Sequence, residues 1–316
     1  GNLPISNYRL ADWPEGAKAW HASNYAKELN AKPWPCKYCV VQCHNLCEVK
    51  KGPYQFKGKG PEYESFAMMG LNTMCADIKA IAYACELADR YSMDTISLGA
   101  VIAWVMECYE KGVITKKDVY GLDLRWGNHE AVVELTKKIG LREGGLAYLL
   151  GEGCQYAAQR IGKGSEDWAV AMKGQEIAAH NWRAQYISAL NYCTGVASGP
   201  NHERGNSQHI WVCNVRLPEW GIGDVSNDER WDWKNLPDYN AKFHDYCNVI
   251  NSAGHCKFQE FSGYTLTDLT NTLNAACGLG WGTDDLRKCG ERITTLQKIL
   301  NIRYGWKKEH DFQYPK

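Results

Sequence analysis

The chain has 316 residues, 45% of them hydrophobic, so it can bury a substantial core in one large domain or two ordinary ones. Lysine plus arginine and aspartate plus glutamate both number 36, and this balance excludes a protein drawn to nucleic acid or to an anionic membrane by its net charge. The longest apolar stretch, residues 98–105, is too short to cross a bilayer, so the sequence predicts no membrane span.

Apolar residues recur at three- and four-residue intervals along much of the chain, which predicts a mainly α-helical protein. The predicted helices, in chain order, are residues 17–29, 78–88, 97–111, 128–139, 145–161, 265–276 and 284–302. Residues 50–60 are rich in glycine and lysine and predict a hairpin or loop, whereas residues 173–235 predict a long irregular segment. We expect two helical domains, residues 1–172 and residues 173–316. The predicted apolar face of the last helix consists of Leu286, Ile293, Leu296 and Leu300.

The 14 cysteines do not predict a disulfide scaffold, because a chain of this length has a large enough core without one. Several lie singly in apolar, helix-like surroundings, where a free thiol behaves as a small hydrophobic side chain. Those cysteines are Cys85, Cys108, Cys154 and Cys193. The composition therefore favours a reducing, anaerobic cytoplasm over export.

Three cysteines stand apart because Cys36, Cys39 and Cys43 fall within eight positions. Soft thiolates at gaps of two and three residues can converge on one inorganic centre, and this spacing favours an iron–sulfur cluster. A zinc ribbon would need a second Cys-x2-Cys pair, which the sequence lacks, and a redox dithiol would leave Cys43 unexplained. A [4Fe-4S] cluster needs a fourth thiolate. The candidates for that ligand are Cys47, Cys256 and Cys277.

Two further segments carry groups suited to acid–base chemistry. Glu62 and Glu64 are two residues apart, so one carboxylate can enter a site while the other meets solvent; acidic residues in the first turn of a helix are the other interpretation. His202 follows a stretch of small residues, at which a bulky ligand can approach the backbone, and its imidazole can transfer a proton near neutral pH. A structural or solvated histidine is the alternative.

Taken in order, these motifs resemble those of the tungsten-containing aldehyde ferredoxin oxidoreductase family. The resemblance rests on Cys-x2-Cys-x3-Cys at 36–43, Gly-Pro-Glu-Tyr-Glu-Ser at 60–65, Asp-Arg-Tyr-Ser-Met-Asp-Thr-Ile-Ser at 89–97, Lys-Gly-Gln-Glu-Ile at 173–177, the glycine-containing approach to His202, Gly-His-Cys-Lys-Phe at 254–258 and Leu-Asn-Ile-Arg-Tyr-Gly at 300–305. It implies a mainly α fold with two helical domains of the aldehyde ferredoxin oxidoreductase type and irregular cofactor-binding loops. It also implies a longer enzyme, whose β-rich N-terminal domain and C-terminal extension are not in this sequence.

The resemblance further implies a bis-pterin cofactor of tungsten or molybdenum beside a [4Fe-4S] cluster. The implied cluster ligands are Cys36, Cys39, Cys43 and Cys256. Two family segments of the type Asp-x-x-Gly-Leu-Asp/Cys embrace the pterins, and here they are residues 89–94 and 251–256. The implied pterin-binding residues are Asp89, Asp94, Asn251, Gly254 and His255.

Both segments depart from the family pattern. In the first, Ser92 and Met93 replace glycine and leucine, and in the second, Asn251 and His255 replace aspartate and leucine. The residues directly before His202 read Ser-Gly-Pro-Asn where the family usually has arginine, glycine, a small residue and then cysteine or aspartate, which implies a pocket that accepts a different substrate.

Glu64 and His202 align with the active-site glutamate and histidine of the family. The implied reaction is the oxidation of an aldehyde to a carboxylic acid, with Glu64 as the base, His202 hydrogen-bonded to the carbonyl oxygen, and electrons leaving through the cluster to ferredoxin or another electron-transfer subunit. The alternatives are a tungsten subunit of the class II benzoyl-CoA reductase type, which acts on an activated acid, and a non-catalytic electron-transfer module. We expect a cytoplasmic homo- or hetero-oligomer that binds no nucleic acid.

Overall fold

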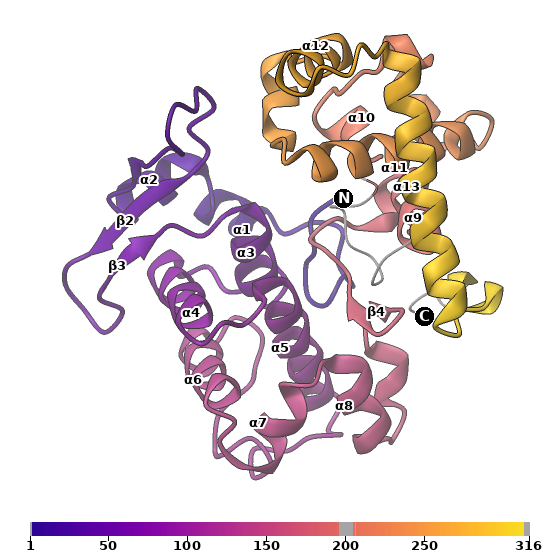
Figure 1. Cartoon of the computed structure of the whole chain (residues 1–316). Coiled ribbons are helices and arrows are strands. Elements are labelled where there is room, and N and C mark those ends of the chain that lie inside the picture. Colours follow the sequence, from indigo (N-terminus) through magenta and orange to yellow (C-terminus); the bar gives the residue numbers. More distant parts are fainter. Residues whose placement is uncertain (1, 196–204, 206, 313–316) are drawn as a thin grey trace. The chain divides into compact units, whose positions relative to one another are not determined.

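The computed structural model of the chain describes residues 2–195, 205 and 207–312. These residues form two compact units, 2–181 and 182–312, which are described separately below (Figure 1). Both units are helical, and in the described residues the strands are short and confined to the first unit, which confirms the prediction of a mainly α fold. None of the described helices is both long enough and apolar enough to cross a membrane.

The first unit begins with two short helices and a small antiparallel sheet. These elements are α1 (Pro14–Ala19), α2 (Ala22–Glu28), β1 (Lys32–Pro33), β2 (Asn45–Val49) and β3 (Phe56–Lys59). One helix was predicted over residues 17–29, but His21 adopts an extended conformation (φ −59°, ψ 141°) and caps α2, so the segment is divided. The strands pair in the order β1-β2-β3, and the predicted hairpin over residues 50–60 is confirmed as the turn between β2 and β3 together with β3.

The sheet has a buried face and an exposed face because side chains alternate along each strand. Cys47 and Val49 of β2 and Phe56 of β3 are buried. This face packs against α4 (Ile78–Arg90), where Glu86 lies so close to Gly58 that a larger side chain at residue 58 would collide with it. The sheet is therefore attached to the helical core through β2 and β3, at the periphery of the unit (Figure 1).

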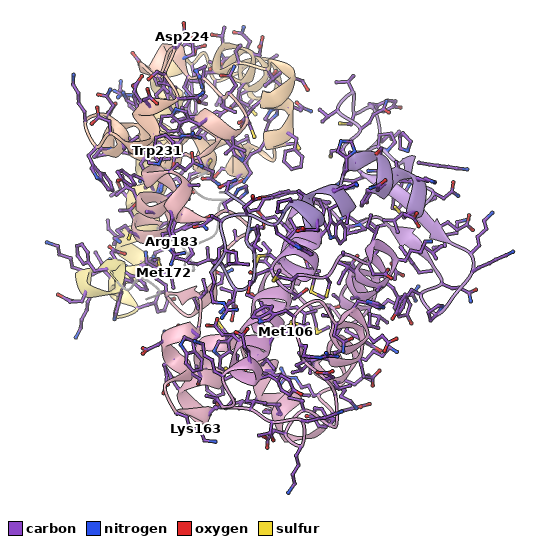
Figure 2. The ribbon with its side chains drawn as sticks, turned by 180° about the vertical axis from the view of Figure 1, so that it is seen from behind. Met106, Lys163, Met172, Arg183, Asp224 and Trp231 are labelled. Atoms are coloured by element: carbon purple, nitrogen blue, oxygen red, sulfur yellow. The ribbon has the colours of Figure 1, made fainter. Side chains whose placement is uncertain are left out.

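The core of the first unit is built around α5 (Thr95–Glu110), which contacts α3 (Tyr63–Phe66), α4, α6 (His129–Gly140) and α8 (Cys154–Ile161). Asp94 caps α5 by accepting a hydrogen bond from the Ser97 amide at 2.8 Å. Figure 2 shows the side chains around α5, with the fully buried Met106 labelled. The predicted helix over residues 97–111 is confirmed.

Helix α3 continues directly into one π-helical turn, η1 (Ala67–Leu71), in which every residue is buried. This turn lies against α5 at Gly99, where the backbone of Met68 approaches too closely for any larger side chain. Single π turns are rare in proteins overall, but those that occur often lie at functional sites. This one directly follows the helix that carries Glu64.

Helix α6 begins where predicted, since the Asn128 side chain accepts a hydrogen bond from the Ala131 amide at 3.3 Å. The single helix predicted over residues 145–161 is instead two helices, α7 (Gly144–Leu150) and α8, because Gly153 has a positive φ of 93° that a helix cannot contain. The first unit ends with the pair β4 (Ala171–Met172) and β5 (Gln175–Glu176).

The second unit contains five α-helices among its described residues. They are α9 (Tyr186–Thr194), α10 (His209–Val212), α11 (Leu236–Ala253), α12 (Leu266–Cys277) and α13 (Thr283–Arg303). The predictions for α12 and α13 are confirmed, but α11 was not predicted, and α9 and α10 lie within the segment predicted to be irregular. Helix α11 buries several polar side chains, which interrupt the apolar pattern on which the prediction depended. Those side chains are Asn240, His244, Asp245 and Asn248.

The predicted apolar face of α13 is only partly buried. Leu286 is buried, and Gly290 lies directly against the backbone of Asp245 in α11. Leu296 and Leu300, however, are 58% and 41% exposed. The predicted apolar face is therefore buried at Leu286 and exposed at these two residues.

Candidate cofactor site

The three clustered cysteines lie in the connection between β1 and β2. Cys36 and Cys43 are exposed and Cys39 is partly buried, and the Cys39 amide donates a hydrogen bond to the Cys36 carbonyl at 3.0 Å. Tyr38 (φ 63°) and Gln42 (φ 51°), the residues directly before Cys39 and Cys43, have left-handed backbone conformations. Such a conformation costs a non-glycine residue about 1 kcal/mol and tends to occur at ligand sites. The loop is thus held in a specific shape.

No group of three ligand side chains within the described ranges has the geometry of a metal site, so the three thiols share one loop without converging on a common point. Their chemistry nevertheless fits a cluster, because they are accessible thiols without apolar burial, and thiolates are the usual ligands of iron–sulfur clusters. Cys256 lies in the second unit, after α11.

The other cysteines of the first unit are unsuited to this role. Burial raises the pKa of Cys75 and Cys108 to about 12 and also raises the pKa of Cys85 and Cys154, so these thiols stay protonated. Cys47, a candidate for the fourth ligand, is fully buried on the inner face of the sheet, and its Sγ lies 3.8 Å from the Tyr25 hydroxyl. Burial raises its pKa as well. The exposed candidates are Cys256 and Cys277, both in the second unit.

The first segment with the family's pterin-binding pattern forms the end of α4. The Ser92 amide donates to the Asp89 carbonyl at 3.1 Å, and the Met93 amide donates to the Ala88 carbonyl at 2.9 Å. Ser92 itself is left-handed, with a φ of 55°. These features define a Schellman turn, in which a left-handed residue ends the helix and satisfies its last carbonyls. Asp94 then begins α5.

The second segment forms the end of α11 and has the same backbone. The Gly254 amide donates to the Asn251 carbonyl at 3.3 Å, the His255 amide donates to the Ile250 carbonyl at 3.0 Å, and Gly254 has a φ of 68°. Gly254 therefore corresponds to Ser92. This turn is common at helix ends, but here it occurs in the two segments that the family pattern pairs. Each turn delivers its last residue, Asp94 or Cys256, directly after the helix.

The left-handed position explains why the family has glycine where this chain has Ser92. A Ser92→Gly substitution should raise the free energy of unfolding by about 1 kcal/mol, because glycine adopts a positive φ without steric strain. Chemical denaturation measures the effect. The matched control is Ser92→Ala, which also removes the hydroxyl but retains the strain and should not stabilise the protein. Equal stabilisation by both substitutions would contradict this explanation.

A pocket of about 320 Å³ lies beside the first turn, wholly within the first unit. Its wall includes Ser92, Asp94 and Ser97 on one side and Arg142 on the other. Arg142 is ion-paired with Glu152 at 2.5 Å, so its guanidinium is held in place. A concave site with a carboxylate and hydroxyls fits the N–H groups of a polar heterocycle such as a pterin.

Glu64 is part of a second polar group in the first unit. Its Oε2 accepts a hydrogen bond from the Ala179 amide at 2.7 Å, and its Oε1 lies 3.2 Å from Nε2 of His180. Both side chains are largely buried, with 19% and 8% exposure. Nδ1 of His180 lies 3.0 Å from the Asn2 side-chain nitrogen. The Ala179 amide thus fixes the carboxylate through Oε2, and Oε1 faces the His180 imidazole.

Tyr63 fixes the same segment from the other side. Its hydroxyl donates to the Ala179 carbonyl at 2.7 Å, and its ring lies 5.2 Å from the His180 ring. Glu62, by contrast, pairs with Lys59 at 2.8 Å and lies 3.2 Å from His44 at the surface. The two glutamates therefore diverge: Glu64 enters the unit, and Glu62 remains near solvent.

His180 was missed by the sequence analysis. It lies three residues after the Lys-Gly-Gln-Glu-Ile motif and belongs to no sequence pattern of its own. It reaches Glu64 only because the fold brings together segments that are 115 residues apart in the sequence. The only available signal was the position of a histidine close to a family motif.

His202 lies outside the described residues. The second unit contains a buried polar network formed by residues near it in sequence and by α11, in which Nε2 of His244 lies 2.9 Å from the Asn191 side-chain oxygen. The Ser207 hydroxyl and the Thr194 hydroxyl are linked through Asn240, each at 2.9 Å. Gly205 has no room for a side chain beside His244 and Asn191. The network was not predicted.

The helical fold and the order of the described segments define a class, the helical cofactor domains of metal–pterin oxidoreductases. The chain belongs to the aldehyde ferredoxin oxidoreductase family: the family model for domains 2 and 3 matches residues 1–316.

Several known proteins resemble the chain over most of its length. A tungsten-containing aldehyde ferredoxin oxidoreductase of Pyrococcus horikoshii is 32% identical over 278 residues, which are 86% of this chain and 42% of the relative. The WOR-like subunit of an aliphatic sulfonate oxidoreductase of Pyrococcus furiosus is 32% identical over 87% of this chain and 40% of the relative. The chain thus spans less than half the length of these relatives.

A solved structure has the same fold. It is the active-site complex BamBC of benzoyl coenzyme A reductase with 1,5-dienoyl-CoA, and one of its chains superimposes with a TM-score of 0.77 at 21% identity. The match covers 99% of this chain and 51% of that chain. This similarity confirms the predicted fold type.

Proposed function

We propose that this chain is the cofactor-binding part of a tungsten–pterin oxidoreductase that oxidises an aldehyde to a carboxylic acid. The observation that carries the proposal is the buried Glu64 carboxylate, held by the Ala179 amide and His180 in a chain that matches the family along its whole length. The name of the P. horikoshii relative supports the choice of tungsten and aldehyde.

When bound, the tungsten bis-pterin supplies the two-electron redox chemistry and a Lewis-acid centre. The residues that would contact the pterins are Asp89, Asp94, Asn251, Gly254 and His255. The accessible thiols of Cys36, Cys39, Cys43 and Cys256 would hold a [4Fe-4S] cluster. In total, aldehyde and water become carboxylic acid with the release of two protons and two electrons, which the cluster would pass to ferredoxin.

The residues of this chain handle the protons and orient the substrate. Glu64 takes a proton from the reacting water or aldehyde hydrate, and the His180 imidazole lies 3.2 Å from its Oε1. His202 donates a hydrogen bond to the carbonyl oxygen of the substrate. Because the Ala179 amide donates to Oε2 and His180 lies against Oε1, the carboxylate has a fixed orientation before substrate binds.

The full-length enzyme would work as an oligomer or as a subunit of a complex in the cytoplasm. The relatives described as a subunit and as the complex BamBC support a multi-subunit arrangement. The BamBC fold also supports a second candidate function, the reduction of an activated acid such as an acyl-CoA.

Metal analysis and one assay test the proposal. Full-length protein purified without oxygen should contain tungsten or molybdenum and about four iron atoms per chain, and it should reduce a viologen dye when an aldehyde is added. Iron without tungsten or molybdenum would overturn the enzyme assignment. A metal-replete enzyme that turns over acyl-CoA but no aldehyde would establish the second candidate instead.

A further inference from the structure

The segment of the small sheet is strongly basic in a chain that is neutral overall. Residues 32–59 contain six lysines and one acidic residue, Glu48. All six lysines are exposed. They are Lys32, Lys37, Lys50, Lys51, Lys57 and Lys59.

The strand register places several of these lysines on one face. Leu46 of β2 lies opposite Lys32 of β1 and Lys59 of β3, so these three side chains share one face of the sheet. Glu48 is two residues further along β2 and lies opposite Lys57, so Lys57 belongs to the same face. The opposite face carries the buried Cys47 and its neighbours. The sheet therefore has its charge concentrated on the side that faces away from the core.

Most of this charge is not neutralised locally. Lys59 pairs with Glu62 at 2.8 Å, and Lys50 pairs weakly with Glu48 at 3.6 Å. The ion pairs of the described residues include no partner for Lys32, Lys51 or Lys57. Isolated surface lysines of one sign create a positive potential that attracts an acidic partner over a Debye length of roughly 10 Å.

Large apolar side chains are exposed in the same segment. Trp34, Tyr38 and Val40, in and beside the cysteine loop, are 54%, 91% and 84% exposed. Aromatic and apolar residues surrounded by charge are typical of the centre and rim of a protein–protein interface. A nucleic acid would be attracted by the lysines alone and gains little from an exposed valine. The combination favours a protein partner.

We propose that this surface, which we name the lysine face, is the docking site for an acidic electron-carrier protein. The lysine face consists of Lys32, Lys37, Lys50, Lys51, Lys57 and Lys59 with Trp34, Tyr38 and Val40. The proposal rests on the proposed function, because the loop with Cys36, Cys39 and Cys43 connects β1 and β2 of this sheet. In each encounter one electron would pass from the cluster to the carrier. This transfer oxidises the cluster and reduces the carrier. Lysines would attract the carrier, and the apolar side chains would form the contact.

The test uses the metal-replete full-length enzyme, a purified acidic ferredoxin and a viologen dye as acceptors. The variant Lys32→Glu/Lys51→Glu should lower kcat/KM for the ferredoxin about 10- to 100-fold when the value is expressed relative to the rate with the dye. The matched control is Lys116→Glu/Lys117→Glu, which reverses two exposed lysines in the connection between α5 and α6 and should leave this ratio unchanged. The milder variant Lys32→Gln/Lys51→Gln should give an intermediate loss, and it covers the case in which charge reversal disturbs folding.

Salt provides a second measurement. The rate with ferredoxin should fall as ionic strength rises in the wild-type enzyme and should fall less steeply in the lysine variants. An unchanged ferredoxin-to-dye ratio in both lysine variants would overturn the proposal, as would tighter binding of a DNA duplex than of ferredoxin to this face. If the wild-type enzyme oxidises no aldehyde, the proposed function fails; ferredoxin binding by wild type and variants, measured by calorimetry, still decides the docking site.

Discussion

A Cys39→Ala substitution is expected to remove the iron–sulfur cluster, with iron falling from about four atoms per chain to near zero and the visible absorbance of the cluster disappearing. Cys39 is the central thiol of the loop and is partly exposed, so its loss removes a ligand without emptying a core position. Anaerobic iron determination and absorption spectroscopy measure the result.

The matched control is Cys47→Ala in the adjoining strand. It removes a thiol that is fully buried and protonated, which should cost about 1 kcal/mol of stability and leave the cluster intact. Retention of the cluster by Cys39→Ala, or its loss in a correctly folded Cys47→Ala variant, would refute this ligand assignment.

The same measurement identifies the fourth ligand. Cys256 and Cys277 are both exposed in the second unit, but only Cys256 directly follows the turn that matches a pterin-binding segment. Cys256→Ala should therefore lose the cluster, and Cys277→Ala should keep it. The opposite pattern would assign Cys277.

The second large effect is expected from Glu64→Gln, which should lower kcat for aldehyde oxidation by about 10²- to 10⁴-fold. Glutamine has the same shape and can still accept the Ala179 hydrogen bond, but it cannot take a proton at the pH of the assay. Steady-state kinetics with a dye acceptor measures kcat and KM separately. The control is Glu62→Gln at the surface, which should have little effect on kcat. Near-normal turnover by Glu64→Gln would exclude Glu64 as the base.

His180 should act on Glu64 by position, because its Nε2 lies 3.2 Å from Oε1 of the carboxylate. His180→Phe removes this polar neighbour, so kcat for aldehyde oxidation should fall about 10-fold while KM changes little. His180→Gln, which keeps a polar side chain at this position, should restore most of the rate. Steady-state kinetics with a dye acceptor separates kcat from KM. A loss of folding stability without a fall in kcat would assign His180 a purely structural role.

Much of the fold follows from local sequence patterns. Helices α5, α6, α12 and α13 were predicted because each has an apolar period, and the capping residue Asn128 also marked the start of α6. Helix α11 was not predicted because its contacts with neighbours bury amides, an imidazole and a carboxylate, so its apolar period is weak. Tertiary pairing of polar groups cannot be inferred from the helix alone.

The candidate site, like the fold, was predicted where local motifs specify it and missed where tertiary contacts do. Glu64 and the cysteine loop were predicted from short motifs, since their residues lie close together in sequence. The contact with His180 depends on how residues 63–66 and 179–180 meet in the folded unit, which no local pattern specifies. The exclusion of Cys47 depended on strand register, because a shift of one residue would have placed its thiol on the exposed face.

The equivalent turns after α4 and α11 show how one backbone form can serve two tasks. After α4 the final carboxylate, Asp94, is committed to starting the next helix. After α11 the final residue is Cys256, whose side chain caps nothing and remains accessible. The choice of one side chain thus decides whether the turn also caps the helix that follows it. Exchanging Asp94 for cysteine would therefore uncap α5 rather than simply add a thiol, so the two turns are alike in geometry but not interchangeable in sequence.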